Sequence, residues 1–219
     1  FQNDLTKILT AFNFIGNKQN HDEDTPMLMD AAGYRESLRA YRPRVFVNGR
    51  TIENVADEPM LLRGINGIGV TYDLAHEAAY RPIMTAVQGT SGKTVNRMTH
   101  INETSADLLA KLEAVRLVCK ISGCAVRYLT HDAFNGLYQA TARADTARGT
   151  DYSQRFLSYM HKVQDEDLTC GIAMTDAKGD RSKRPGQQAN RDSYVHISER
   201  RKDGIVIRGA KAIVTGAPY

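Results

Sequence analysis

The stretch Asp167-Leu-Thr-Cys-Gly-Ile-Ala-Met-Thr-Asp-Ala-Lys-Gly-Asp-Arg-Ser-Lys-Arg-Pro185 decides how this chain is divided, because its character changes halfway along. Its apolar first half predicts a short buried strand over residues 168–175. Its second half is charged and contains glycine, which predicts a loop carried by that strand. The loop offers a hydroxyl at Thr175 and cations at Lys178 and Arg181, followed by Lys183 and Arg184. It is therefore either a solvated turn or a site for a phosphate-bearing ligand.

Length and composition describe a globular protein of one large or two small domains. The chain has 219 residues, of which 42% are hydrophobic and 25% are charged. A net charge of +4 with scattered basic residues does not favour a nucleic-acid partner. No apolar run approaches the length of about 18 residues that a membrane span needs, and no signal peptide is recognisable. Three cysteines argue against a disulfide framework and favour a cytoplasmic location.

Local signals predict a largely helical region before residue 167. A helix is expected over 35–40, and Asn48-Gly49 predicts a hairpin over 45–52. Further helices are expected from residue 57, with Pro59 in the first turn, and over 104–121, 124–143 and 152–164. The remaining expectations are a loop at 81–82, strands over 168–175, 193–199, 205–207 and 212–215, and a turn at 202–204.

The segment Gly89-Thr-Ser-Gly-Lys-Thr94 has some features of a phosphate-binding P-loop. The Walker pattern requires another glycine five residues before Gly92, and Val87 occupies that position. No clear strand precedes the segment either. We therefore predict a solvated turn here.

Several longer motifs resemble a family of flavoproteins that contains 4-hydroxybutyryl-CoA dehydratase and the 4-hydroxyphenylacetate 3-hydroxylases. The first is Met174-Thr-Asp-Ala-Lys-Gly-Asp-Arg181, similar to the FAD-contacting loop of the dehydratases, which usually have Pro at the position of Ala177. The others are Arg44-Val-Phe-Val-Asn-Gly-Arg-Thr-Ile52, Tyr72-Asp-Leu74, His131-Asp-Ala-Phe-Asn-Gly-Leu137 and Asp203-Gly-Ile-Val-Ile-Arg-Gly-Ala-Lys211. The resemblance extends from about residue 34 to the end.

The resemblance implies an α+β fold like that of the acyl-CoA dehydrogenases, with an N-terminal helical domain followed by the start of a β-barrel or β-sandwich domain. Residues 1–33 would be an N-terminal extension. Residues 34–166 would form the helical domain, and 167–219 would begin the middle β-domain. Members of the family are longer and tetrameric, so a homo-oligomer, or a second chain that carries the C-terminal half, is expected.

The resemblance also implies a cofactor site. FAD would bind residues of the 174–181 loop and a threonine near the flavin. The residues concerned are Met174, Thr175, Asp176, Lys178, Gly179, Asp180, Arg181 and Thr215, and Thr215 is also a catalytic candidate. Arg116 lies in a region that approaches the CoA substrate in the dehydratases, although an exposed helix cation is the simpler interpretation. Ile213 replaces a His that is found in many dehydratases.

Cys124 and Tyr128 are the other catalytic candidates. If residues 124–132 are helical, these two side chains lie on one face. The dehydratases have two cysteines at this spacing that bind an iron–sulfur cluster, and Tyr128 takes the place of the second. Cys119 cannot substitute, because five helical residues turn it about 140° away from Cys124. The sequence therefore supports no cluster and no other metal site.

The hydroxylase branch has an Arg and a Tyr at these two positions, so only Tyr128 matches that branch. Ile172 falls where that branch has a His that helps to bind the phenolic substrate. Without the resemblance, Cys124 would be a small buried residue and Tyr128 a core aromatic.

Three functions follow from the resemblance. The first is an FAD-dependent dehydratase, isomerase or dehydrogenase that acts on an acyl-CoA substrate without an intact cluster. The second is an FADH₂-dependent aromatic monooxygenase that is supplied by a separate reductase. The third is an inactive piece that scaffolds a second chain.

Overall fold

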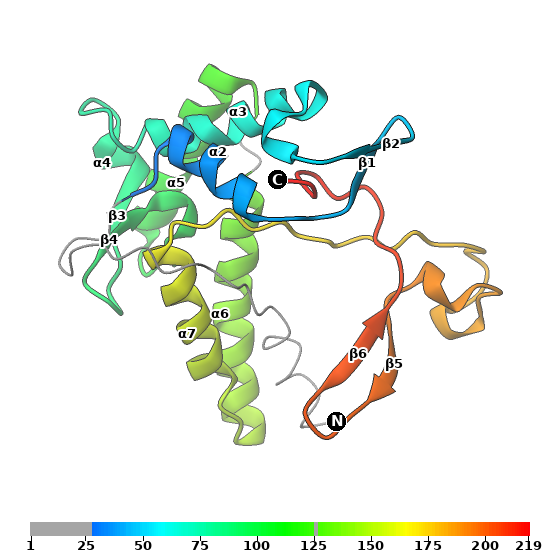
Figure 1. The fold of residues 1–219 in the computed structure, drawn as a ribbon. Helices are drawn as coiled ribbons and strands as arrows, with labels where there is room; N and C mark the ends of the chain where they lie inside the picture. Colours follow the sequence, from blue (N-terminus) through cyan, green and yellow to red (C-terminus); the bar gives the residue numbers. More distant parts are fainter. Residues whose placement is uncertain (1–27, 125–126) are drawn as a thin grey trace. The chain divides into compact units, whose positions relative to one another are not determined.

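The computed structural model describes residues 28–124 and 127–219 (Figure 1). The interpretation of the first 27 residues as part of an extension lies outside the described residues. The chain forms two compact units. The helical unit contains the described residues of Asp24–Gly171 together with Gly216–Tyr219, and the loop–hairpin unit contains Ile172–Thr215. The loop–hairpin unit begins at Ile172. The domain boundaries expected from the sequence remain predictions.

The helical unit is made of helices with two small hairpins. Its helices are α2 (Ala31–Ala40), α3 (Pro59–Asp73), α4 (Arg81–Met84), α5 (Ser105–Ser122), α6 (Tyr128–Arg148) and α7 (Tyr152–Asp165). Its strands are β1 (Val45–Val47), β2 (Arg50–Ile52), β3 (Thr85–Val87) and β4 (Thr94–Asn96), and its 3₁₀ turns are η1 (Val55–Asp57) and η2 (Arg97–Thr99). The mixed α+β class expected from the sequence is confirmed, with two-stranded antiparallel sheets throughout the described residues.

Local signals explain where most of these elements begin and end. The β1–β2 hairpin turns through Asn48 and Gly49, both with positive φ, as the type I′ turn requires. Pro59 opens α3, where its missing N–H costs nothing. Thr104 and Asp107 form a reciprocal capping box at the start of α5. These three predictions are confirmed.

One loop prediction and one helix start are wrong. The loop expected at residues 81–82 is instead α4, because Pro82 stands in the first turn, where proline is tolerated. The helix expected from Cys124 begins only at Tyr128. Gly123 ends α5 in the left-handed conformation, so Cys124 belongs to the connection between the helices. Cys124 and Tyr128 are therefore not paired on one helical face.

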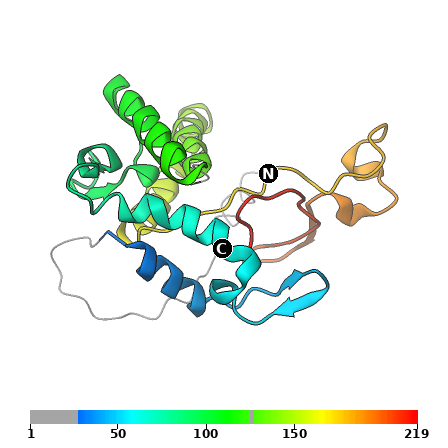
Figure 2. The same ribbon diagram turned by 90° about the horizontal axis from the view of Figure 1, so that it is seen from above.

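Apolar packing holds the helical unit together in three clusters. One contains Met84, Met98 and Val118, and a second contains Tyr34, Ile65 and Tyr72 around α2 and α3. The third joins α6 to α7 through Phe134, Phe156 and Met160. Figures 1 and 2 show α6 and α7 running side by side. Among the described residues, no helix is long and apolar enough to cross a membrane.

The loop–hairpin unit contains β5 (His196–Arg200) and β6 (Ile205–Arg208), preceded by the 3₁₀ turns η3 (Pro185–Gln187) and η4 (Arg191–Ser193). The two strands pair antiparallel, with Ile197 opposite Ile207. The strand predictions for 193–199 and 205–207 and the turn at 202–204 are confirmed, apart from small shifts at the ends.

The strands expected over 168–175 and 212–215 are not formed, and this part of the sequence prediction is wrong. Between these two segments, the described residues form one isolated antiparallel bridge, which joins Asp176 to Lys211. Gly209 and Ile213 both have positive φ, at 136° and 58°, and they break the extended backbone on either side of that bridge. Before the bridge, the carbonyls of Asp167, Leu168 and Cys170 accept hydrogen bonds from side chains of the helical unit instead of from a neighbouring strand.

Candidate functional site

A buried ion pair fixes the chain just before the candidate loop. The Arg127 side chain is 1% exposed, and its Nη2 lies 2.5 Å from Oδ1 of Asp167. The guanidinium group lies over the ring of Tyr72, 4.0 Å from its centroid. The Tyr72 hydroxyl donates to the Asp167 carbonyl over 2.8 Å, and Oδ2 of Asp167 accepts from the backbone N–H of Met29. We call Tyr72, Arg127 and Asp167 the Arg127 anchor.

Thr175 and Asp176 are engaged in holding the loop to the segment 210–212. The Thr175 hydroxyl donates to the carbonyl of Ala212, and the Thr175 carbonyl accepts from the N–H of Ala212 over 2.9 Å. Oδ1 of Asp176 lies 2.9 Å from Nζ of Lys211 and accepts from the N–H of Val195 over 3.2 Å. The hydrogen bond from Lys211, and then that from Val195, lowers the pKa of Asp176.

Gln188, which the sequence gave no reason to select, orders the next part of the loop. Its side chain is buried, accepts from the N–H of Asp180 over 2.9 Å and donates to the Asp180 carbonyl over 2.8 Å. A Cβ atom at Gly179 would lie 2.4 Å from Oε1 of Gln188, so a larger residue there would displace the Gln188 side chain. The Asp180 carboxylate accepts from Ser182, which lowers its pKa.

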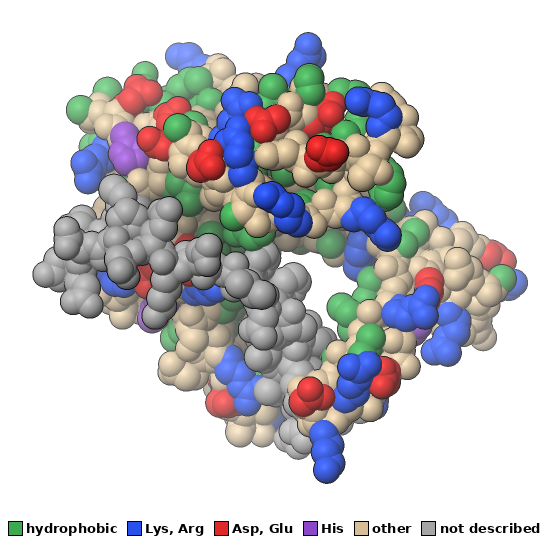
Figure 3. All heavy atoms as spheres, in the orientation of Figure 1, with side chains coloured by type: hydrophobic (Ala, Val, Ile, Leu, Met, Phe, Trp, Pro, Cys, Tyr) green, Lys and Arg blue, Asp and Glu red, His purple; other side chains and the backbone are tan. Residues whose placement is uncertain are grey.

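The cations Lys178 and Arg181 remain available after these contacts. Both are exposed, and neither forms an ion pair within the described part of the chain. They line an open pocket of about 330 Å³ with Thr175, Asp176, Ala177, Gly179, Ala212 and Ile213. Residues 172–215 contain ten Lys or Arg and five Asp or Glu, a net +5 against +4 for the whole chain. Figure 3 shows Lys and Arg side chains on this unit. An anionic group suits this pocket.

The other predicted site residues are distributed over the chain. Tyr128 is half-buried at the start of α6, beside the cluster that contains Met84 and Val118. Cys124 is exposed in the preceding connection, and Arg116 is exposed on α5. Thr215 is exposed in a turn after the loop–hairpin unit's bridge, and Met174 is exposed just before Thr175.

The cysteines do not fit an iron–sulfur cluster. Cys119, Cys124 and Cys170 are all free, and they lie on α5, in the connection before α6 and after α7. No group of three or more His, Cys, Asp or Glu side chains in the described ranges is arranged to hold a metal ion. A cluster needs about four such ligands around one centre, and the described residues do not bring four together.

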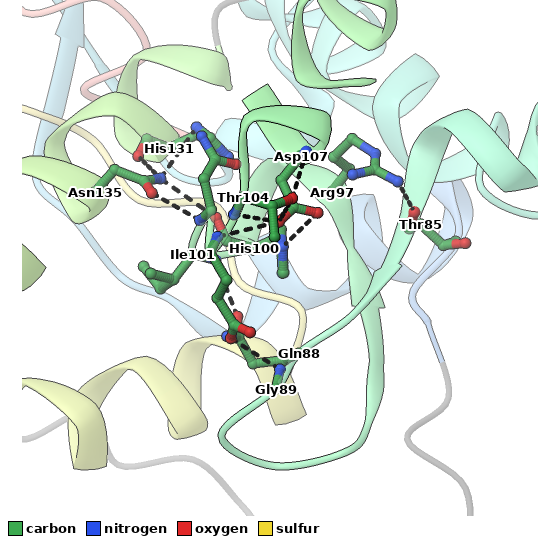
Figure 4. Close-up of polar contacts among 12 residues, drawn as sticks. Thr85, Gln88, Gly89, Arg97, His100, Ile101, Thr104, Asp107, His131 and Asn135 are labelled. Carbon is green, nitrogen blue, oxygen red and sulfur yellow. Dashed lines mark hydrogen bonds and ion pairs between the residues drawn. The ribbon is translucent and has the colours of Figure 1, made fainter. Parts of the chain in front are cut away.

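The segment after Val87 is a turn, as predicted. The expectation that no strand precedes it is wrong, because β3 ends at Val87. An internal carboxylate accepts a hydrogen bond from an N–H group of this turn. Glu103 accepts from the N–H of Gly89 over 3.0 Å and from the side chain of Gln88 over 2.8 Å. Figure 4 shows Gln88 and Gly89 beside a further buried polar network in which Asn135 contacts His131. The Glu103 carboxylate would repel a phosphate at this turn, which agrees with the rejection of a P-loop.

Comparisons with known proteins identify the family. The model of the 4-hydroxyphenylacetate 3-hydroxylase N-terminal family matches residues 30–219. The chain is 41% identical to 4-hydroxybutyryl-CoA dehydratase/vinylacetyl-CoA-Δ-isomerase of Clostridium aminobutyricum over 87% of this chain and 39% of that protein. It is 24% identical to the oxygenase component of 4-hydroxyphenylacetate 3-monooxygenase of Thermus thermophilus, over 86% of this chain and 38% of that protein.

The fold is also similar to solved structures. An oxygen-tolerant archaeal 4-hydroxybutyryl-CoA dehydratase from N. maritimus matches with a TM-score of 0.83 and 36% identity, over 88% of this chain and 38% of the other. An oxygenase component of 4-hydroxyphenylacetate 3-monooxygenase, complexed with FAD and 4-hydroxyphenylacetate, matches with a TM-score of 0.70 and 24% identity, over 84% and 38%. This chain therefore spans less than half of its relatives. It belongs to the 4-hydroxybutyryl-CoA dehydratase and 4-hydroxyphenylacetate 3-hydroxylase flavoprotein family, and it corresponds to the N-terminal part of those proteins.

Proposed function

We propose that this chain is part of an FAD-dependent enzyme that acts on an acyl-CoA substrate, as a lyase, isomerase or dehydrogenase without an iron–sulfur cluster. The observation that carries the proposal is that Lys178 and Arg181, which make no ion pair among the described residues, line a pocket on this loop. The 41% identity to 4-hydroxybutyryl-CoA dehydratase/isomerase favours this branch of the family.

Each loop residue has a distinct part in this proposal. Lys178 and Arg181 bind the FAD diphosphate through charge-assisted hydrogen bonds. Asp176, Gly179 and Asp180 keep the loop in shape through Lys211, Gln188 and Ser182. Thr175 contributes its backbone close to the ring, because its hydroxyl already donates to Ala212. Met174 and Thr215 complete the flavin contacts.

The substrate side of the site is assigned to the helical unit. Tyr128 and Cys124 are the catalytic candidates of this unit, and Arg116 is the candidate for binding the CoA portion of the substrate. When bound, FAD supplies a ring that exchanges electrons or hydrogen with the acyl chain. A double-bond isomerase or a dehydrogenase needs no iron–sulfur cluster for this chemistry. The same proposal includes a homo-tetrameric assembly. It also includes a β-barrel or β-sandwich domain, of which residues 167–219 form the beginning.

The test is to titrate FAD into the purified protein by fluorescence quenching. Arg181→Ala removes a charge-assisted hydrogen bond to the diphosphate and weakens binding by about 10- to 100-fold. Lys202→Ala removes a cation from the exposed β5–β6 turn of the same unit and is the matched control. If both variants bind FAD like the parent, the loop is a solvated turn and the cofactor assignment is lost. Anaerobic iron and sulfide assays test the missing cluster separately, and cluster iron in full amount would contradict it.

An FADH₂-dependent aromatic monooxygenase is the second candidate. Tyr128 favours it, because the resemblance aligns this residue with a tyrosine of the hydroxylases. The test is to measure O₂ consumption that depends on NADH and a reductase, with 4-hydroxyphenylacetate as substrate. Turnover of the phenol and none of 4-hydroxybutyryl-CoA would place the chain in this branch.

The third candidate, a scaffold for a second chain, requires another polypeptide. Mass spectrometry of the native, purified protein measures this directly. A partner chain that co-purifies in fixed ratio would support it, and a flavin-loaded homo-oligomer of this polypeptide would contradict it.

A further inference from the structure

Lys111 is buried in a position where a lysine is unusual. It lies in the middle of α5, its side chain is only 7% exposed, and it faces the start of α6. Lysine is almost never fully buried unless its charge is paired. Its Nζ forms an ion pair with Asp132 of α6, whose side chain is half exposed. A lysine at this place therefore has a defined partner on the neighbouring helix.

The same ammonium group contacts a second residue of α6. Nζ of Lys111 lies 5.7 Å from the centroid of the Tyr128 ring, within the range of a cation–π interaction. Tyr128 and Asp132 are four residues apart, so they are neighbours on one face of α6. From α5, Lys111 thus contacts both Tyr128 and Asp132. The Tyr128 hydroxyl makes no hydrogen bond within the described part of the chain. The polar contact of this side chain is therefore the one between Lys111 and the ring face, and the hydroxyl remains available for a ligand.

We propose that Lys111 is a positioning residue for Tyr128, whose ring it orients through its contact with the ring face and its ion pair to Asp132. The inference rests on the proposed function, in which Tyr128 is a catalytic residue. A methionine would fill the volume of the lysine, but it would neither attract the electron-rich ring face nor bind Asp132. The charge at residue 111 therefore determines how firmly the ring is placed.

The surroundings of Lys111 show that its charge acts over the start of α6. On the same helix, the buried His131 has its pKa lowered to about 4, by burial first and then by the charge of Lys111. Asp132 acts in the opposite direction on His131, and His100, from the segment before α5, lowers it further. The charge of Lys111 thus acts on the first turns of this helix, and nothing in the loop–hairpin unit is needed for this arrangement.

The test compares three variants of the purified protein. Lys111→Met removes the charge and keeps the length of the side chain, and Lys111→Arg keeps the charge. Lys120→Met changes an exposed lysine of the same helix and is the control. For each variant we measure FAD affinity by fluorescence quenching, the thermal unfolding midpoint, and kcat and KM with 4-hydroxybutyryl-CoA. Nitration of Tyr128 by tetranitromethane, followed by mass spectrometry, reports on the tyrosine without requiring activity.

Lys111→Met is expected to lower kcat by about 10-fold, as a contact of this type implies. KM, FAD affinity and the unfolding midpoint are expected to stay close to the parent, and the rate of Tyr128 nitration to change. Lys111→Arg should recover part of kcat, and Lys120→Met should match the parent throughout. A Lys111→Met variant with parental kcat and nitration overturns the inference.

A coupled fall of kcat, FAD affinity and unfolding midpoint also overturns the inference, because it makes Lys111 a packing residue. Absence of FAD binding or of acyl-CoA turnover in the parent is a different result and refutes the proposed function instead. In that case the nitration rates alone decide whether Lys111 positions the Tyr128 ring.

Discussion

Replacing Asp167 by Asn tests the Arg127 anchor with little other change. The substitution removes the negative charge, keeps the shape, and suits the backbone, because Asp167 has φ of 44° and Asn tolerates this region. Arg127 would remain buried with its charge uncompensated, which costs about 3–5 kcal/mol. Nη2 of Arg127 also bonds to the carbonyls of Asp167 and Leu168, both over 3.2 Å. Because these bonds remain, we expect a loss near 3 kcal/mol, the low end of that range of about 3–5 kcal/mol.

Urea unfolding followed by circular dichroism measures this loss. With a slope of about 2 kcal/mol per molar urea, the midpoint should fall by about 1.5 M. Asp165→Asn is the control, because Asp165 pairs with Lys93 at an exposed site, where an ion pair contributes about 1 kcal/mol or less. In an Arg127→Met background, Asp167→Asn should lower the free energy of unfolding much less, because it leaves no uncompensated cation at position 127. An Asp167→Asn protein that unfolds within 0.5 M of the parent, a shift of about 1 kcal/mol, would refute the reasoning.

Two further predictions concern the helical unit. Because the pKa of His131 is about 4 in the folded chain and about 6.5 when unfolded, the unfolded state binds the extra proton, and stability falls as the pH drops from 6.5 through 4, by up to about 3 kcal/mol. His131→Gln should flatten this part of the pH–stability curve, and an unchanged curve would contradict the assignment. Thr104→Ala should destabilise the protein by about 1 kcal/mol through loss of the α5 cap, seen as a lower midpoint of urea unfolding. The exposed Thr146→Ala change within α6 should leave that midpoint almost unaltered, and equal effects of the two threonine changes would argue against the cap.

Sequence patterns predicted the elements whose signals are local. The hairpin at Asn48-Gly49 and the cap at Thr104 each depend on residues within a few positions of one another, so one segment contains the whole signal. The strand expected over 168–175 failed because a strand requires a partner elsewhere in the chain. Arg127 and the Tyr72 hydroxyl take the backbone acceptors of residues 167 and 168 instead, and no local pattern indicates this.

The candidate loop was selected by its charge and by resemblance, but the assignment of individual side chains needed the structure. Asp176 pairs with Lys211, which is 35 positions away, and Thr175 donates to Ala212. These contacts leave Lys178 and Arg181 as the cations of the pocket. Gln188 could have been suspected only as a polar residue near a glycine-containing loop, which is too common a pattern to select it.

The Arg127 anchor also has a consequence for how the chain folds during synthesis. Asp167 contacts Met29, Tyr72 and Arg127, which precede it by 138, 95 and 40 residues. Contacts at such separations close large loops and slow folding relative to local helix pairing. On the ribosome, α2, α3 and the start of α6 would leave the exit tunnel well before Asp167 is available. A nascent chain that pauses in this interval holds an unpaired Arg127 cation, and it can complete its core only when Asp167 emerges.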